Sequence, residues 1–444
     1  MSDDEQRLAA TRAALDKISP TMCLAKWLQV TLYLKQGHGS SCHYPPAHAI
    51  PAESLRADPA RLHNTEVKLA ARRQMLRGER PAECSYCWRL EDLGQTSDRI
   101  YKSSFDWAQP HLKQVTEAGA DHSIDPTYLE VAFDSVCNFK CIYCTPTHSS
   151  SWWQEIKRFG PYPTSQNYHQ IHDTHGDVES LALSEKDPYS EAFWHWWPTL
   201  SQRLKVFRIT GGEPLLISHT WRVLEWLKHE PRPELTLSIN SNLGISESKV
   251  DQLIENLQQL CDKVKNIVLY VSMDTQGAQA EYIRYGLDYA QFMHHADKIL
   301  TKVTTPIEFS YMATASTLSV TGFTGFLRDV NEQKRKFGAR HTIRVSTTFV
   351  RTPSFLSPQI LPPEFAHHFR AAAEFMTTTG RFEEEEIDNV RRLVHLMEQP
   401  QALEQLHTDR SDFRKMIEEY DRRRGTNFLK TFPEYAGFWQ MCTC

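Results

Sequence analysis

The chain has 444 residues, of which 40% are hydrophobic, and its formal net charge is −5. This length allows two or three domains, or one barrel with additions, around a large buried core. The mild acidity, without a basic block, argues against bulk electrostatic attraction to nucleic acid. The start MSDDEQRLAA lacks the features of a signal peptide, and no apolar run approaches the roughly 18 residues of a transmembrane helix. We therefore expect a soluble cytoplasmic protein without a membrane partner.

The N-terminal region, residues 1–125, is distinguished by its cysteines, two of which form a compact C-x-x-C pair. They are Cys23, Cys42, Cys84 and Cys87. Four cysteines can complete a zinc site or bind an iron–sulfur cluster. The residues alone do not separate these alternatives from free thiols.

Regular alternation of strands and helices begins at Tyr128 and extends over residues 126–352. The predicted strands are Tyr128–Asp134, Lys205–Thr210, Leu235–Asn240, Asn266–Asp274, Ile307–Ala315 and Thr342–Val350. The helices between them are Ser149–Phe159, Ile217–His229, Ser246–Cys261, Asp288–Val303 and Gly322–Phe337. This order indicates a parallel sheet with right-handed crossovers. We predict an α/β fold, a partial (β/α)6 TIM-like barrel.

The segment 160–198 breaks this alternation and is expected to be an insertion. Its tryptophan-rich run, residues 193–197, either packs in the core, which we favour, or walls a substrate site. At the end of one predicted helix, Cys261 is expected to be a small buried apolar residue.

Residues 353–444 are predicted to be helical only, over Pro362–Thr379, Glu384–Glu398 and Gln401–Arg424. The acidic run Glu383–Glu386 is expected to be a solvated helix start, where negative charge meets the positive end of the helix dipole. Cys442 and Cys444 lie in a tail that we expect to be mobile, with free thiols. A docked tail would instead cap the functional site.

Three cysteines directly after the first predicted strand carry the strongest chemical signal. Cys137, Cys141 and Cys144 occur in the run CNFKCIYC. Three thiolates on one tight loop suit an iron–sulfur cluster better than structural zinc, which usually takes four protein ligands. Three protein ligands would leave one iron of a four-iron cluster open to another ligand.

Other polar motifs also follow predicted strands. The turn Gly211–Pro214 follows the second, residues 240–242 end the third, and Ser272 and Asp274 end the fourth. Ligands of parallel α/β folds bind beyond the carboxyl ends of the strands, so we expect a single site there. A Gly-Gly pair alone marks many turns, and the nearby cysteines give this one its weight.

The cysteine spacing, with Tyr143 before the third cysteine, and the GGEP turn resemble the signature of the radical S-adenosylmethionine (SAM) superfamily. The match covers roughly residues 128–350. It implies that the three cysteines bind a [4Fe–4S] cluster whose open iron chelates SAM. It further implies SAM-binding roles for Tyr143, for Gly211, Gly212, Glu213 and Pro214 at the amino group, for Ser238 and Asn240 at the ribose, and for Ser272 and Arg284 at the carboxylate. Arg284 is alternatively a surface charge on a helix.

The sequence around the four N-terminal cysteines resembles twitch or SPASM-type radical SAM proteins, which carry an auxiliary cluster. In many relatives that module follows the barrel, whereas here it precedes it. The resemblance implies an auxiliary iron–sulfur cluster on Cys23, Cys42, Cys84 and Cys87.

We therefore expect a radical SAM enzyme that cleaves SAM to a 5′-deoxyadenosyl radical and abstracts a substrate hydrogen atom. A peptide or protein side chain is the favoured substrate, a small molecule stays open, and flavodoxin or ferredoxin is the expected type of electron donor. The alternatives are a zinc-stabilised binding protein without catalysis and a radical SAM enzyme acting on nucleic acid, which the acidic balance disfavours. Asp274 and His148 are expected near the site, but the sequence assigns no catalytic acid or base.

Overall fold

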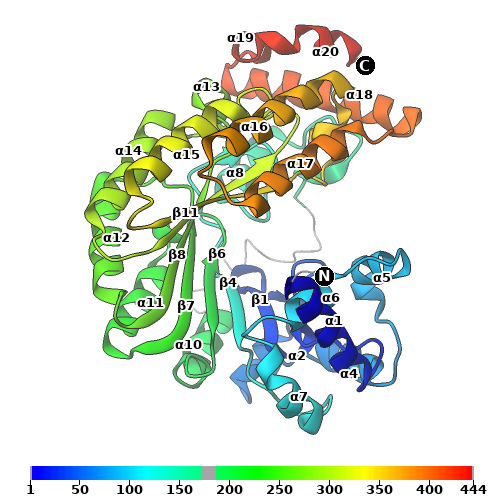
Figure 1. Cartoon of the computed structure of the whole chain (residues 1–444), viewed down its shortest axis with the longest axis vertical. Helices are drawn as coiled ribbons and strands as arrows, with labels where there is room; N and C mark the ends of the chain where they lie inside the picture. Colours follow the sequence, from blue (N-terminus) through cyan, green and yellow to red (C-terminus); the bar gives the residue numbers. More distant parts are fainter. Residues whose placement is uncertain (1–2, 172–186, 443–444) are drawn as a thin grey trace.

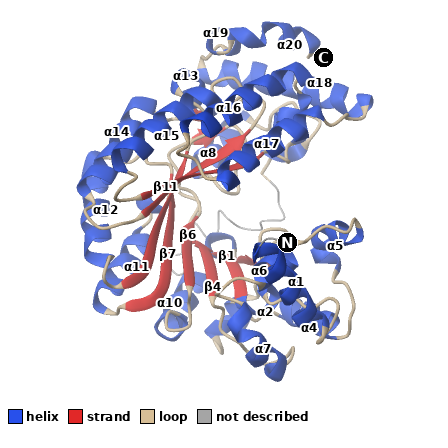
Figure 2. Cartoon of the chain, in the orientation of Figure 1, coloured by secondary structure: helices blue, strands red, loops and turns tan. Residues whose placement is uncertain are grey.

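The computed structural model describes residues 3–171 and 187–442. Within these ranges nine strands form one sheet, in the order β11-β10-β8-β7-β6-β4-β1-β2-β3. The strands from β11 to β1 run parallel, whereas β2 and β3 add antiparallel at the edge. Figures 1 and 2 show this curved sheet, with helices on its outer face and at both ends of the chain.

The predicted alternation is confirmed, with element ends that differ by a few residues. The strands of the main sheet are β1 (Gln29–Tyr33), β2 (His38–Ser40), β3 (His48–Ala49), β4 (Tyr128–Ala132), β6 (Val206–Thr210), β7 (Arg232–Ser241), β8 (Val264–Ser272), β10 (Glu308–Ala315) and β11 (Thr342–Phe349). The helices of the array are α8 (Ser150–Phe159), α10 (Pro188–Leu200), α11 (Ser218–His229), α12 (Glu247–Leu260), α13 (Gly277–Ile283), α14 (Tyr289–Lys302) and α15 (Phe323–Phe337).

Side chains on the parallel strands alternate between an apolar outer face and a polar inner face. Leu129 and Val131 of β4 and Phe207 of β6 are buried in the core under the helices. Glu130 and Arg208, which are partners in the β4–β6 register, occupy the other face. Successive side chains of a strand point to opposite faces, so the inner face forms a polar lumen. The α/β partial barrel expected from the sequence is thus confirmed.

The N-terminal region contributes strands to the same sheet, so the expected boundary between residues 125 and 126 does not divide it. Strand β1 pairs in parallel with β4, from Gln29↔Tyr128 to Tyr33↔Ala132. Sequence alternation did not reveal β1, because no helical crossover of the usual pattern adjoins it. The helices of this region are α1 (Asp3–Asp16), α2 (Ala25–Leu28), α3 (Ala52–Leu55), α4 (Glu66–Leu76), α5 (Ser85–Asp92), α6 (Asp98–Ser103) and α7 (Leu112–Ala118).

A side-chain contact joins the segment after β11 to a helix of the N-terminal region. Arg351, just beyond β11, lies over the ring of Tyr86 in α5, with 5.5 Å between Cζ and the ring centroid. Tyr86 itself stacks on Tyr44 with ring centroids 3.8 Å apart. The cysteine-bearing N-terminal region therefore lies against the open side of the partial barrel.

The connection from β4 to β6 holds the expected insertion, of which residues 172–186 lie outside the described ranges. Its last part, α10, belongs to the barrel core. Phe193 and Trp197 are fully buried, and Trp196 is nearly so. Core packing, the favoured interpretation of this tryptophan-rich run, is therefore confirmed for the helix.

The C-terminal helices cover one end of the barrel (Figure 1). They are α16 (Ala366–Thr379), α17 (Glu384–Glu398), α18 (Leu403–Arg424), α19 (Phe428–Thr431) and α20 (Ala436–Met441). The expected helix start at the acidic run is confirmed, but one of its residues is not solvated. Glu386 is 3% exposed and accepts hydrogen bonds from Lys334 Nζ and the backbone N–H of Val345.

The expectation of a mobile tail is wrong for Cys442, which is fully buried against the C-terminal helices. Aromatic side chains such as Phe438 fix this end of the chain. Cys444 lies outside the described residues. Cys261 is half-buried rather than buried. No helix in the described part of the chain combines the length and apolar character needed to cross a bilayer.

Candidate functional site

The three clustered cysteines lie on the loop that leaves β4 at the carboxyl edge of the sheet. Hydroxyl groups at the start of α8 hold this loop: Ser151 Oγ donates to Cys137 O at 2.6 Å, and Ser149 Oγ donates to Phe139 O at 2.9 Å. Trp152 Nε1 donates to Cys141 O at 2.9 Å. The serine run therefore fixes the cysteine backbone as well as beginning the helix.

The Gly211-Gly212 turn packs directly against the cysteine loop. Glu213 N donates to Val136 O at 2.7 Å, and Gly212 N donates to Asp134 O at 3.2 Å. A Cβ atom on Gly212 would lie 2.1 Å from Val136 O. Gly211 has φ +122°, and its Cβ would lie 2.7 Å from Asp134 O. Only glycine allows so close an approach of the two backbones, so the two sequence motifs form one structural unit.

The carboxylate of Glu213 is fully buried and is used inside the protein. It accepts hydrogen bonds from Leu215 N at 3.0 Å, Ser241 Oγ at 2.9 Å and Asn242 N at 2.6 Å. Burial raises the pKa of Glu213 to about 7, although these three donors act in the opposite direction. The side chain thus ties the turn to the end of β7.

Asn242 belongs to the run expected at the end of the third predicted strand, but no contact was assigned to it from the sequence. Its Nδ2 lies 3.9 Å from Cys137 Sγ and donates to Asn138 Oδ1 at 3.0 Å. The Asn-Ser-Asn run at the end of β7 was the available signal, but its spacing does not show which of the three side chains turns toward the cysteines.

Arg284 is buried beneath the cysteine loop, so the surface-charge alternative is wrong. It is 5% exposed and forms a two-point ion pair with Asp274, with distances of 2.9 and 3.0 Å. The third nitrogen of the guanidinium, Nη1, lies 3.7 Å from Cys141 Sγ. Tyr143, the aromatic residue of the motif, donates from its hydroxyl to Asp274 at 2.6 Å.

Three residues expected to contact the ribose or the carboxylate of SAM lie on strands of the barrel. Asn240 Oδ1 accepts from Arg208 Nε at 2.9 Å, which places this amide in the polar lumen. Ser238 is buried on β7 in register with Arg208, and Ser272 ends β8 in register with Met312 of β10. All three therefore lie on the lumen face. His148 lies near the cysteine loop, and with Tyr33 it lines a surface hollow beside it.

The donor set around the three cysteines fits an iron–sulfur cluster. Two nitrogen donors, from Arg284 and Asn242, face Cys141 Sγ and Cys137 Sγ, as expected for sulfurs that carry negative charge. Burial raises the pKa of the Cys137 and Cys144 thiols, and that of Cys141 to about 12. Metal binding requires deprotonated thiolates, so it would have to overcome this cost of burial.

In the described ranges, no three His, Cys, Asp or Glu side chains converge as on one metal ion.

The four N-terminal cysteines, which are far apart in sequence, line one cavity. Cys23 precedes α2 and Cys42 follows β2, whereas Cys84 lies directly before α5 and Cys87 lies in its first turn; all four border the same cavity. Burial raises the pKa of Cys23, and those of Cys84 and Cys87 to about 12. None of the nine described cysteines forms a disulfide bond.

Cationic side chains share this cavity with the cysteines. Lys26, Arg99 and Lys102 line it, and each is at most 9% exposed. Lys26 pairs with Glu83, and Arg99 pairs with Glu91 at 2.8 Å. Buried cations at this position suit a group of thiolates with a net negative charge.

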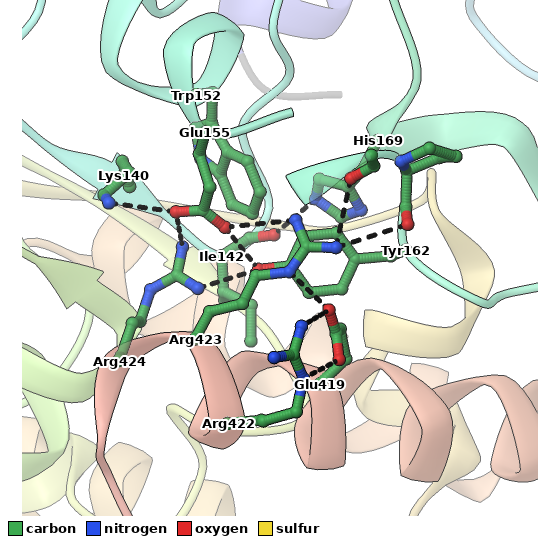
Figure 3. A network of polar contacts seen from close by, with 12 residues as sticks. Lys140, Ile142, Trp152, Glu155, Tyr162, His169, Glu419, Arg422, Arg423 and Arg424 are labelled. Atoms are coloured by element: carbon green, nitrogen blue, oxygen red, sulfur yellow. Dashed lines mark hydrogen bonds and ion pairs between the residues drawn. The ribbon is translucent and has the colours of Figure 1, made fainter. Parts of the chain in front are cut away.

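The last turn of α18 holds the outer side of the cysteine loop through a buried ion network (Figure 3). Glu155 of α8, 3% exposed, pairs at 2.9 Å with Lys140, which lies between Cys137 and Cys141, and with Arg424. Arg423 lies 3.6 Å from the other carboxylate oxygen. The C-terminal helices, expected as a separate region, therefore form part of the wall of the site.

Replacing Glu155 by glutamine is expected to lower the free energy of unfolding by about 3 kcal/mol. The change leaves the buried guanidinium groups of Arg423 and Arg424, and the half-buried Lys140, without their shared anion. Breaking a buried ion pair on one side is strongly destabilising. Glu418→Gln is the matched control, because Glu418 is 51% exposed and forms a surface ion pair with Arg414; it should cost about 1 kcal/mol or less. Urea unfolding measures both, and equal effects would contradict the role given to Glu155.

Comparison with known proteins gives a partial sequence match and distant structural likenesses. No protein-family model matches the chain. GTP 3′,8-cyclase of Nautilia profundicola is 27% identical over 115 residues, which are 26% of this chain and 27% of that protein. The match thus spans about a quarter of the relative's length. It supports the resemblance to the radical SAM superfamily at that general level. The solved structure of SuiB from Streptococcus suis aligns over 78% of this chain and 67% of that one, at 13% identity and a TM-score of 0.33.

Proposed function

We propose that the chain is a radical SAM enzyme. The observation that carries this proposal is the packing of the cysteine loop on the Gly211-Gly212 turn at the carboxyl edge of a parallel sheet. The two backbones are so close that a Cβ added to Gly212 would lie 2.1 Å from Val136 O. A metal ion that only stabilises the fold would not require a glycine turn from the neighbouring strand at this place. Ligands of parallel α/β folds bind at this edge.

Cys137, Cys141 and Cys144 are the proposed ligands of a [4Fe–4S] cluster. When bound together, that cluster and SAM supply the electron transfer and the 5′-deoxyadenosyl radical that removes a substrate hydrogen atom. The chain's own residues position these groups. Backbone atoms of the glycine turn would hold the amino group of SAM, and Ser238, Asn240 and Ser272 lie on the lumen face where its ribose and carboxylate would bind. The barrel excludes water from this chemistry.

The lumen supports a polar substrate. Glu130 and Arg208 face each other at 3.8 Å, and Glu130 Oε2 and Thr31 Oγ1, on paired strands, are buried without a hydrogen-bond partner among the described residues. Buried polar atoms of this kind usually find a partner. We propose a peptide or protein side chain as the substrate, and flavodoxin or ferredoxin as the type of electron donor.

We further propose an auxiliary iron–sulfur cluster on Cys23, Cys42, Cys84 and Cys87. Replacing Cys84 and Cys87 by alanine is expected to remove about four of about eight iron ions per reconstituted chain while SAM cleavage persists. Iron and zinc are counted by elemental analysis. One zinc and about four irons in the wild-type chain would contradict the auxiliary cluster and favour a zinc site.

The proposed function is tested by anaerobic reconstitution with iron and sulfide, reduction with dithionite, and measurement of 5′-deoxyadenosine formed from SAM. Iron binding with SAM cleavage supports the proposal. A colourless protein that binds zinc and leaves SAM intact would favour the non-catalytic alternative. Adding GTP, a synthetic peptide or RNA in parallel identifies the substrate class by its stimulation of 5′-deoxyadenosine formation.

A further inference from the structure

Arg284 is fixed opposite one of the three cluster cysteines by the backbone. Strands β5 (Lys140–Cys141) and β9 (Arg284–Tyr285) form a separate two-stranded sheet in which Cys141 and Arg284 are direct partners. Ile142 N donates to Ile283 O at 2.8 Å and continues this pairing. The position of the guanidinium therefore follows from main-chain hydrogen bonds.

Asp274 holds the guanidinium in one orientation. Its carboxylate, 1% exposed, accepts from Arg284 Nε and Nη2, from the Tyr143 hydroxyl at 2.6 Å and from Thr314 N at 2.8 Å. A carboxylate offers about four acceptor positions, so Asp274 has no capacity left for a substrate or for SAM. It is a positioning residue, as is Tyr143.

The remaining donor of this fixed guanidinium points at sulfur. Arg284 Nη1 lies 3.7 Å from Cys141 Sγ. Hydrogen bonds to the sulfurs of an iron–sulfur cluster, and positive charge near it, favour the reduced state, which carries one more negative charge. The guanidinium is cationic, because an arginine side chain is not deprotonated in proteins.

We propose that Arg284 sets the reduction potential of the cluster by donating to Cys141 Sγ, with Asp274 and Tyr143 holding it in place. This inference rests on the proposed function. It assigns Arg284 a different role from the SAM-carboxylate contact expected from the sequence. Of the three cysteines, Cys141 is the one that receives a charged donor in the described structure.

The test is a redox titration of the reconstituted wild-type, Arg284→Lys and Arg284→Met chains without SAM, followed by EPR spectroscopy. The signal of this cluster is identified as the one that changes when SAM is added. Arg284→Met should make reduction at least tenfold less favourable, a shift of about 59 mV for one electron toward more negative potential. Arg284→Lys keeps the positive charge but loses the planar guanidinium that pairs with Asp274 at two points. The reduction potential of this variant should shift less. SAM affinity should stay unchanged in both.

Arg410→Met is the matched control, since Arg410 is a half-buried arginine of α18 that donates to Ile360 O. The reduction potential of the cluster in this variant should equal that in the wild type. An unchanged potential in Arg284→Met, or weaker SAM binding at unchanged potential, would overturn the inference and leave the proposed function standing. Loss of iron from both Arg284 variants would also overturn it, because the residue would then retain the cluster rather than tune it. A wild-type chain that takes up no iron would instead refute the proposed function.

Discussion

Replacing Cys137, Cys141 and Cys144 together by alanine is expected to remove about four iron ions from each reconstituted chain and to abolish formation of 5′-deoxyadenosine. These thiols are the proposed ligands of the cluster that delivers the electron to SAM. The fold should survive, because the loop backbone is held by the serine and tryptophan side chains of α8 rather than by the sulfurs. Iron analysis and chromatography of the SAM products measure the two effects.

Cys261→Ala is the matched control, since Cys261 is a half-buried cysteine at the end of α12, whose Sγ lies 3.1 Å from Gln258 O. It should leave both the iron content and SAM cleavage unchanged. A triple variant that still cleaves SAM would refute the assignment of these three cysteines. The remaining iron in the triple variant should be that of the N-terminal site.

Gly212→Ala is expected to abolish binding of the cluster at Cys137, Cys141 and Cys144, although it adds a single methyl group. The new Cβ would lie 2.1 Å from Val136 O and 2.6 Å from Val136 C. Both are main-chain atoms of the cysteine loop, so no side-chain rotation relieves the overlap. Overpacking in a core costs about 1–3 kcal/mol, and here the strain falls on the loop that carries Cys137. We expect a large loss of iron with a small change in helix content by circular dichroism.

Gly437→Ala provides the comparison, because no atom of another described element lies within 4 Å of its Cβ position in α20. This change should leave the iron content unaltered. Gly212→Ala with normal iron and normal SAM cleavage would show that the cysteine loop and the turn do not need their close contact. That result would remove the main structural support for the proposed function.

The strands and helices of the barrel were predictable because each follows from a local pattern. Buried Val, Ile and Leu alternate with polar residues in the strands, and apolar residues recur at helical spacing in α12. Strand β1 was not predictable in this way. Its five residues pair with β4 nearly a hundred positions later, and pairing at such a distance leaves no periodic trace in the sequence.

The candidate site shows the same difference between features encoded in neighbouring residues and contacts made only by the fold. Cys137, Cys141 and Cys144 lie within eight residues, so their chemistry was visible from spacing. The partner of Arg284 was not visible. Asp274 is ten residues away in the loop after β8, and only the pairing of β5 with β9 brings the guanidinium beneath Cys141.

The sequence by itself determined the order of strands and helices and the identity of the cysteine loop, because both are encoded in neighbouring residues. Only the tertiary structure decided that four scattered N-terminal cysteines border one cavity, that Gly212 contacts Val136, and that Glu155 pairs with Arg424. These contacts join segments up to 269 residues apart. Their geometry depends on the packing of complete elements, which no short stretch of sequence specifies.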